Sequence, residues 1–527
     1  MKHKILSIIG AGLLLMTAWS CREQSDELLA YDHNDAMVFG AAENSFAAKF
    51  NVMWNGLNQY YALWDFEAEQ GVDWDAAYQE FYPQFAALDK RDKNNPVTDA
   101  ELKELLDKFL GPLHDGHFHM AVKNHMTGSS VMCRPSDERF AKRDDYNTSE
   151  ITFSLRYYAD VAHGEIETDA DGNPIVKEHA TDFNTIFTAF YKTEGQGFQW
   201  MKARKKELDA KPSLTDYETF ELQQIEDLAT DLNQIGGHSI GEAIAMWNRL
   251  VIQYSFLNVP GFDYIDPAFY ENGIGVKYAL LKGNIAYFGF TGFELSSYLN
   301  DEECASIFDL SVPATQQHVN QMKEVWQSWF DAVQQLHKNG TLGGVIIDVR
   351  NNGGGNMDDS QYVVGSLVPA GGIHFGYQRF KRGTGRYEYS PLMPAIVGSM
   401  EQPHETITEP VVIMTNCFSV SMSETSALCV KTMPNGTTLG NRSYGAICAL
   451  VDNEYNSFNY AGYIGVNGVT PVFGKVPSMA SFTLDKKIIE AEGITPDIEV
   501  DFDIPLFNST GQDTQLDRAL QFIRTGK

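Results

Sequence analysis

Basic residues are scarce in this chain of 527 residues, in which 40 lysines and arginines face 70 aspartates and glutamates. The formal charge of −30 at pH 7 repels a phosphate backbone, so nucleic acid is not an expected partner. Long apolar runs are also missing, because no segment beyond the N-terminus approaches the ~18 apolar residues of a bilayer-spanning helix. We therefore expect no membrane-spanning segment in the mature protein.

Cysteines are few as well, and the six present lack the C-x-x-C spacings of a zinc cage or a disulfide scaffold. The sequence leaves open one local disulfide among Cys417, Cys429 and Cys448. Internal repeats and low-complexity tracts are absent too. With 43% hydrophobic residues the chain can instead build conventional cores, and its length predicts two or three domains.

The N-terminus starts with the basic "MKHK", continues with the apolar "ILSIIGAGLLLM" and reaches Cys21 after "TAWS". This layout is typical of a secretory signal and is too short to span a bilayer. Because a cysteine directly follows the apolar core, residues 1–21 resemble a bacterial lipoprotein signal peptide. The resemblance implies lipidation of Cys21 and export to the cell envelope, on its periplasmic or outer face. Ordinary secretion with an incidental Cys21 is the alternative.

An acidic tether, residues 22–43, is expected to lead into a helical N-terminal domain over residues 44–118. Within this domain, residues 46–64 carry aromatic and aliphatic side chains at three- and four-residue spacings. Residues 97–113 begin with a Thr/Asp cap and end at Gly-Pro, which predicts a second amphipathic helix.

Residues 119–275 give mixed signals. A strand-like alternation covers residues 150–161, whereas residues 200–210 and 216–232 have helical patterns. We interpret this part as a middle domain or a long insertion, and the sequence does not assign its fold.

Residues 276–527 alternate strand and helix. A hairpin is predicted over 275–290 and a long helix over 318–340, and two short buried strands, "GGVIIDV" and "PVVIMT", each lead into a turn and a helix. This order predicts an α/β domain with a parallel or mixed sheet covered by helices.

The first strand-to-helix turn contains Gly353, Gly354 and Gly355. Their flexible backbones can point N–H groups outward beside a helix N-terminus, which suits an anion or a developing oxyanion. No Lys-Ser/Thr pair follows, so a nucleotide P-loop is disfavoured. A plain tight turn is the alternative.

The second turn carries serines at alternate positions, Ser419, Ser421 and Ser423, without a G-x-S-x-G elbow. Ser421 is the best placed nucleophile, because the helix starting near Met422 points its free N–H groups toward the preceding residue, and the Met422 N–H becomes a second oxyanion donor. Ser423 and Glu424 are expected to cap the helix. In the alternative interpretation, all three serines only cap and turn the chain.

Four segments in order, "GGVIIDVRNNGGG", "VVIMTNCFSVSMSE", "TTLGNRSYGA" and "EGITPDIEV", resemble the catalytic domain of the tail-specific, or C-terminal processing, serine protease family. The resemblance covers roughly residue 275 to the C-terminus, and "LHDGHFHM" is similar to the helical part of the family's tricorn-like branch. It implies an α/β catalytic domain of the tail-specific-protease type over residues 276–527, with Ser421 as the nucleophile.

The proton acceptor differs between the branches of that family. The C-terminal processing branch uses a lysine in "F-G-K-G", but the similar "SYGAIC" here has Ala446 at that position. The tricorn-like branch uses a histidine and a glutamate, which correspond to His117 in "HDGHFHM" and Glu490 in "EAEGITPD". Gly116 stands where that branch has a serine. Lys431, the nearest lysine in sequence, is the rival base.

Two other interpretations apply to the histidine segment. Asp115 and the histidines at 114, 117 and 119 could hold a metal ion, although no distant third ligand is evident. His117 could also be a structural histidine beside a glycine turn.

The sequence thus predicts an exported serine endopeptidase that acts on peptides or unfolded proteins and needs neither cofactor nor metal. Ser421 would attack the carbonyl, His117 would take its proton, Glu490 would steady the imidazole, and N–H groups of Gly353 or Gly354 and of Met422 would hold the oxyanion. Membrane contact would run through the lipid anchor alone. No Gly-Leu-Gly-Phe-like loop of a PDZ module is evident, so recognition of substrate tails is not predicted. The rival is a non-catalytic ligand-binding protein on the same scaffold.

Overall fold

The computed structural model describes residues 40–136, 276–383 except Thr291, 385–398, 400, 402–451, 462–503 and 512–527, with scattered residues between 139 and 269 and residue 506. The chain divides into two compact units, which are described separately below. Unit 1 comprises residues 1–138, 377–393 and 448–482, and unit 2 comprises residues 139–376, 394–447 and 483–527. The predicted signal peptide, the tether up to residue 39 and the strand predicted at 150–161 lie outside the described residues.

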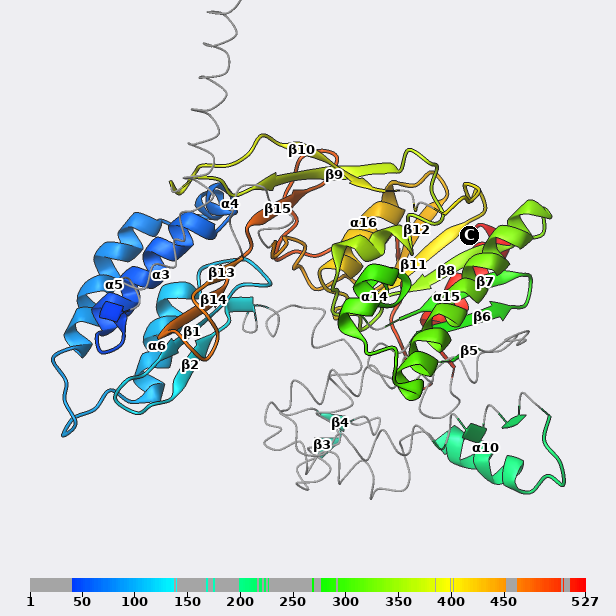
Figure 1. Cartoon of the computed structure of the whole chain (residues 1–527), viewed down its shortest axis with the longest axis horizontal. Coiled ribbons are helices and arrows are strands. Elements are labelled where there is room, and N and C mark those ends of the chain that lie inside the picture. The colour runs from blue at the N-terminus through cyan, green and yellow to red at the C-terminus, as the bar shows by residue number, and fades with distance from the viewer. Residues whose placement is uncertain are drawn as a thin grey trace, which may run out of the picture. The chain divides into compact units, whose positions relative to one another are not determined.

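The described part of unit 1 includes the helices α3 (Phe46–Tyr60), α4 (Trp64–Glu69), α5 (Trp74–Leu88) and α6 (Asp99–Leu110), shown in blue in Figure 1. Helix α6 starts with a capping box, in which the Thr98 hydroxyl accepts the Glu101 N–H and the Glu101 carboxylate accepts the Thr98 N–H. The helices pack through aromatic rings, among them the stacked pair Trp54 and Trp74, with centroids 4.7 Å apart. The predicted helical N-terminal region is confirmed.

A four-stranded antiparallel sheet completes unit 1, in the order β13-β14-β1-β2. Its strands are β1 (His119–Lys123), β2 (Ser130–Cys133), β13 (Tyr463–Ile464) and β14 (Val472–Lys475). In this register Met120 lies opposite both Cys133 and Gly474, so segments some 350 residues apart in the chain form one sheet. The sheet places His117 two residues before the start of β1.

Unit 2 is built on a seven-stranded sheet in the order β16-β12-β11-β8-β7-β6-β5 (Figure 1). Its strands are β5 (Ala268–Phe269), β6 (Lys277–Leu281), β7 (Ile285–Gly289), β8 (Gly344–Asp348), β11 (Val411–Thr415), β12 (Gly436–Gly440) and β16 (Ile498–Glu499). The pairs from β7 to β16 are parallel, whereas β5, β6 and β7 are antiparallel. The mixed sheet and the predicted hairpin are confirmed.

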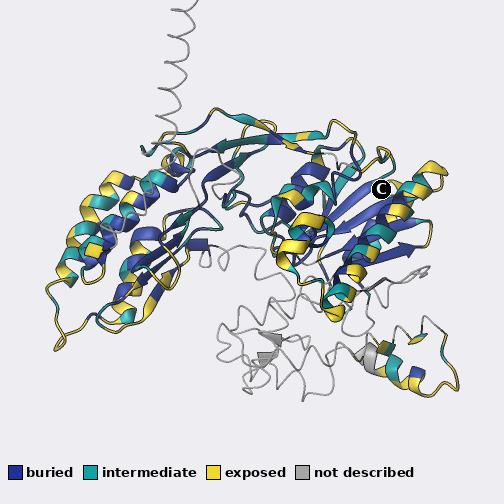
Figure 2. Cartoon of the chain, in the orientation of Figure 1, coloured by how far each residue is buried: buried dark blue, intermediate teal, exposed yellow. Residues whose placement is uncertain are grey.

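Helices cover both faces of this sheet. Leu516, Ala519 and Leu520 of α18 (Thr514–Thr525) pack against one face, which includes Ile346 and Met414. The other face packs against α15 (Pro313–Lys338), whose Trp329 stacks on Phe288 with centroids 4.7 Å apart. Central strands are buried throughout (Figure 2), as their continuous apolar runs predict.

The described residues form several other elements. They are α10 (Gln199–Asp209), α13 (Ser296–Leu299), α14 (Asp301–Ile307), α16 (Met422–Thr432), the 3-10 helix η2 (Met357–Gln361), a sheet in the order β10-β9-β15 with β9 (Ile373–Phe380), β10 (Met393–Val397) and β15 (Met479–Phe482), and the pair β3 (Glu167–Thr168) and β4 (Pro174–Ile175). Among the described residues, no helix has both the length and the apolar character that a membrane span requires. Cys417, Cys429 and Cys448 are all buried and none of them is in a disulfide, so the bridge left open by the sequence does not form.

Candidate active site

Two loops of unit 2 follow the neighbouring parallel strands β8 and β11. We call residues 349–356, after β8, the glycine turn, and residues 416–421, between β11 and α16, the serine turn. The carboxyl ends of parallel strands lie at one edge of a sheet, which is where open α/β sheets place their ligand sites. The loops touch, because Val420 N–H donates to the Asn352 carbonyl at 3.0 Å.

Ser421 has an unusual backbone conformation, with φ 58° and ψ −112°. Non-glycine residues seldom occupy positive φ, and such strain is found at functional sites when the surroundings enforce it. A serine on a sharp, strained turn from a strand into a helix also has the geometry of a nucleophile elbow. Ser421 has this geometry without the G-x-S-x-G sequence.

The three serines differ in their surroundings. Ser419 and Ser423 are fully buried, and their hydroxyls donate to the carbonyls of Val349 and Asn352, both at 2.8 Å. Ser421 is partly exposed. Only this hydroxyl is therefore presented to a substrate, whereas the other two fix the serine turn to the glycine turn.

The capping prediction is corrected in one respect. The residue at the N-cap of α16 is Ser421, and Ser423 lies inside the first turn, where its hydroxyl bonds to the glycine turn instead of capping the helix. Glu424 does accept the N–H of the N-cap residue, at 3.1 Å.

Gly354 lies against Ser421. A methyl group on Gly354 would meet the Ser421 Cβ at 2.6 Å and the Met422 nitrogen at 3.0 Å, and the glycine also has φ 86°. Its N–H donates to Asn352 Oδ1 at 2.9 Å. Within the described parts of the chain, neither Gly353 N–H nor Met422 N–H donates to a protein acceptor. These two groups are thus available to an oxyanion.

Arg350 anchors the start of the glycine turn. Its buried guanidinium donates to Asp348 and Asp513, with the shortest distances at 2.7 and 2.8 Å, and Nη1 donates to Gln515 Oε1 at 3.0 Å. Burial alone would raise the pKa of the Asp348 carboxyl, but the charge and hydrogen bonds of Arg350, together with Lys277 and Tyr287, outweigh burial and lower that pKa. The turn is tied in this way to the start of α18.

His117 belongs to unit 1, where Asp115 shapes the backbone that presents it. Asp115 Oδ1 accepts the N–H groups of His117 at 2.7 Å and of Phe118 at 2.8 Å. Burial, helped by the charge of Lys475, lowers the pKa of His117 to about 4. The imidazole is therefore neutral at pH 7 and can accept a proton.

His114 is one of the four candidate metal ligands named from the sequence, with Asp115, His117 and His119. Its Nδ1 lies 2.7 Å from Glu67 Oε2, and Glu67 Oε1 also accepts the His114 N–H at 2.8 Å. The Nδ1 atom of His114 is therefore already in contact with a carboxylate. Burial also lowers the pKa of His119 to about 4.

Glu490 contacts the residue that follows Ala446, and both lie in unit 2. Glu490 is fully buried, and its Oε2 accepts the N–H of Ile447 at 3.0 Å. Ala446, the preceding residue, is fully buried too. Lys431 pairs with Asp497 and donates to the Thr495 carbonyl, so its amine is already engaged. His117 lies in unit 1 and Ser421 in unit 2, so the meeting of imidazole and hydroxyl stays a prediction.

Sequence reasoning missed the partners of Glu424. This carboxylate is fully buried, and besides Ser421 it binds Ser443, Gly445 and Ala446. The sequence hinted at a special backbone here only through Gly445 in "SYG". This glycine has φ 96°, and a methyl group on it would lie 2.7 Å from the backbone of Ala491.

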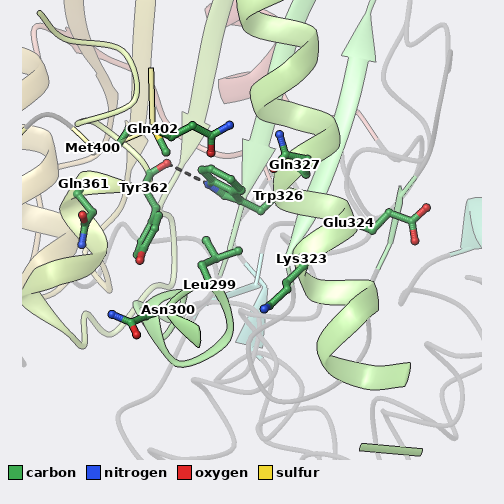
Figure 3. A pocket seen from close by; sticks show the side chains of 10 residues that line it. All are labelled: Leu299, Asn300, Lys323, Glu324, Trp326, Gln327, Gln361, Tyr362, Met400 and Gln402. Atoms are coloured by element: carbon green, nitrogen blue, oxygen red, sulfur yellow. Dashed lines mark hydrogen bonds between the residues drawn. The ribbon is translucent and has the colours of Figure 1, made fainter. Parts of the chain in front are cut away.

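A pocket of about 640 Å³ lies elsewhere in unit 2 (Figure 3). Residues from α15, the α13–α14 junction, the end of η2 and the segment after β10 line it: Leu299, Asn300, Lys323, Glu324, Trp326, Gln327, Gln361, Tyr362, Met400 and Gln402. Trp326 at its centre donates to the Tyr362 carbonyl at 3.0 Å, and Lys323 pairs with Asp301 at 2.7 Å. Its lining includes neither the serine turn nor the glycine turn.

Residues 317–500 match the sequence model of peptidase family S41. This stretch includes both turns and Glu490, and the match supports a peptidase domain of the serine type. The tricorn protease of Thermoplasma volcanium is 26% identical over 188 residues, which are 34% of this chain and 14% of that protein. The chain thus matches only a small part of that relative.

Solved structures are similar as well. Mature CPAF complexed with lactacystin has a TM-score of 0.47 and 11% identity, covering 92% of this chain and 100% of that chain. The photosystem II D1 C-terminal processing protease has a TM-score of 0.27 and 18% identity, covering 47% of this chain and 54% of that one.

Proposed function

We propose that this protein is an exported serine endopeptidase that hydrolyses peptide bonds of peptides or unfolded proteins. The single observation that carries the proposal is the strained, partly exposed Ser421 at the start of α16, with the unengaged N–H of Met422 beside it. A hydroxyl and an oxyanion donor at one helix N-terminus are the two parts that acyl transfer needs first.

In the proposed mechanism the Ser421 oxygen attacks the scissile carbonyl while His117 takes the hydroxyl proton. The carbonyl oxygen becomes an oxyanion, which accepts hydrogen bonds from the N–H groups of Met422 and Gly353. His117 then gives the proton to the leaving amine, and an acyl ester remains on Ser421. Water, activated by the same imidazole, hydrolyses the ester and restores the serine. Glu490 stabilises the imidazolium that forms in both steps.

The neutral state of His117 supports its role as a base, since a protonated imidazole could not accept the serine proton. The loss of the lysine at Ala446 supports it as well. Cys21 is the proposed lipid attachment site, which would hold the enzyme at the cell envelope.

Labelling with a fluorophosphonate tests the nucleophile. The full chain should be labelled once, and Ser421→Ala should abolish labelling while Ser311→Ala, a change at an exposed serine, leaves it intact. A folded wild-type protein that takes no label would favour the alternative, a non-catalytic ligand-binding protein on this scaffold.

Peptides blocked at both ends test the mode of cleavage. An endopeptidase cuts N-acetylated, C-amidated peptides internally, so mass spectrometry should find two fragments from each cut. An enzyme that requires a free terminus would leave these peptides intact.

A further inference from the structure

The fully buried carboxylate of Glu424 contacts the last residue of the serine turn, Ser421. Glu424 is the third residue of α16, and its two oxygens accept four hydrogen bonds. Oε1 accepts the Ser443 hydroxyl at 2.6 Å and the Gly445 N–H at 2.8 Å. Oε2 accepts the N–H groups of Ala446 at 2.8 Å and Ser421 at 3.1 Å.

The four donors fit an ionised carboxylate. Three of them are backbone N–H groups, which can only donate. The fourth, the Ser443 hydroxyl, accepts the Ile494 N–H at 2.6 Å and so directs its own proton to Glu424. Burial raises the pKa of the Glu424 carboxyl, and these hydrogen bonds oppose that shift.

The donors also come from two separate segments. Ser421 is the N-cap residue that precedes α16, whereas Ser443, Gly445 and Ala446 follow β12. The two segments touch a second time, because the Ser421 N–H donates to the Ala446 carbonyl at 3.1 Å. The Ser421 N–H is thus held between the Glu424 carboxylate and the Ala446 carbonyl. It cannot turn toward a substrate, and the next free N–H is that of Met422.

We propose that Glu424 is a positioning residue that holds Ser421 in its strained conformation by binding the Ser421 N–H and the 443–446 segment together. The inference rests on the proposed peptidase function. Glu424 is fully buried and acts through Ser421, so it does not touch the substrate. Its loss should misplace the hydroxyl and the Met422 N–H in the transition state and leave substrate binding nearly unchanged.

Glu424→Gln is the direct test, because a carboxamide has the same shape but brings an NH₂ group against donors. At least one of the four donors must then move away, because two hydrogen-bond donors cannot bond to each other. We expect kcat and the rate constant of fluorophosphonate labelling to fall on the order of 10²-fold, as for a small misplacement of a reacting group, with KM unchanged. Ser443→Ala, which removes one donor to Oε1 and keeps the Oε2 contacts, should cost much less.

Folding is measured in parallel by thermal unfolding of each variant. A Gln variant that keeps wild-type kcat, or one in which kcat and KM change together, overturns the proposal. So does a variant whose activity loss matches its loss of folded protein, since Glu424 would then serve folding alone. Glu424→Asp keeps the charge but is one methylene too short to reach both segments, so it should show the same selective loss of kcat. If the wild-type protein takes no label, the proposed function fails instead.

Discussion

The backbone N–H of Ser421 donates to the carbonyl oxygen of Ala446 at 3.1 Å. Ala446 is fully buried, and it is the residue at which the sequence resemblance to the C-terminal processing branch would place a lysine. A methyl group cannot take the proton of the Ser421 hydroxyl. In the mechanism proposed above, the base therefore comes from another part of the chain, and variants of His117 and Lys431 distinguish the two candidates.

His117→Ala is expected to lower kcat/KM by ~10²–10⁴, the usual contribution of a general base. Lys431→Met should leave kcat/KM within about twofold, because that amine is paired with Asp497 and not with the serine. His337→Ala is the matched control, since this histidine lies 2.8 Å from Glu409 and has no part in the proposed chemistry. Steady-state hydrolysis of a peptide decides the question, and full activity in the His117 variant would exclude it as the base.

The pH dependence should follow the pKa of His117, which burial lowers from 6.5 to about 4. A base with a lowered pKa stays neutral until the pH falls toward that value, so kcat/KM should show no titration near pH 6.5 and an acid limb near pH 4. The same lowered pKa affects the free energy of unfolding. The neutral His117 side chain contributes its full share to stability above pH 6.5, and this share is lost as the pH falls toward 4. A half-maximal rate near pH 6.5 would contradict an imidazole in this environment.

Gly354→Ala and Gly353→Ala form a matched pair. A methyl group at Gly354 would lie 2.6 Å from the Ser421 Cβ, at a residue whose φ of 86° already disfavours a side chain. A methyl group at Gly353 meets nothing within 4 Å, and alanine keeps the backbone N–H that the proposed oxyanion hole uses. We expect the first change to reduce fluorophosphonate labelling on the order of 10²-fold through displacement of Ser421, and the second to leave labelling nearly intact. Equal losses in both variants would argue against a steric role for Gly354.

The local elements could be predicted because their signals lie within a few residues of each other. The Thr98-Asp99 cap predicted the start of α6, and the alternating pattern around Lys282-Gly283-Asn284 predicted the β6–β7 hairpin. The order of strand, glycine turn, strand and serine turn also placed Gly354 and Ser421 at one sheet edge.

The missing features depend on contacts between distant segments. No periodicity links Glu424 to the 443–446 segment, since the pairing follows from how the chain after β12 returns to α16. The unit 1 sheet is a similar case, because β1 pairs with β14 across some 350 residues. The positive φ of Ser421 could not be read from residue type either, since serine has no preference for that region.

Arg350→Met should destabilise the protein more than any surface ion-pair change. The arginine is the guanidinium partner of Asp348 and Asp513, and all three side chains are buried. Removing it leaves two buried carboxylates without that partner, which typically costs about 3–5 kcal/mol of unfolding free energy. Lys323→Met, which breaks an exposed pair with Asp301, should cost far less, because solvent screens an exposed ion pair. Urea unfolding followed by tryptophan fluorescence measures both.

The pH dependence of the stability lost in Arg350→Met is a second, independent measurement. Arg350 holds the pKa of the Asp348 carboxyl below its usual range, so this pair contributes stability above the unfolded pKa of aspartate and loses it as the pH falls. In Arg350→Met the buried Asp348 carboxyl takes up a proton more readily, because no guanidinium opposes its protonation. The stability gap between wild type and variant should therefore narrow as the pH falls from neutral toward about 4. A gap that stays constant over this range would mean that Arg350 stabilises the glycine turn by packing and not through its charge.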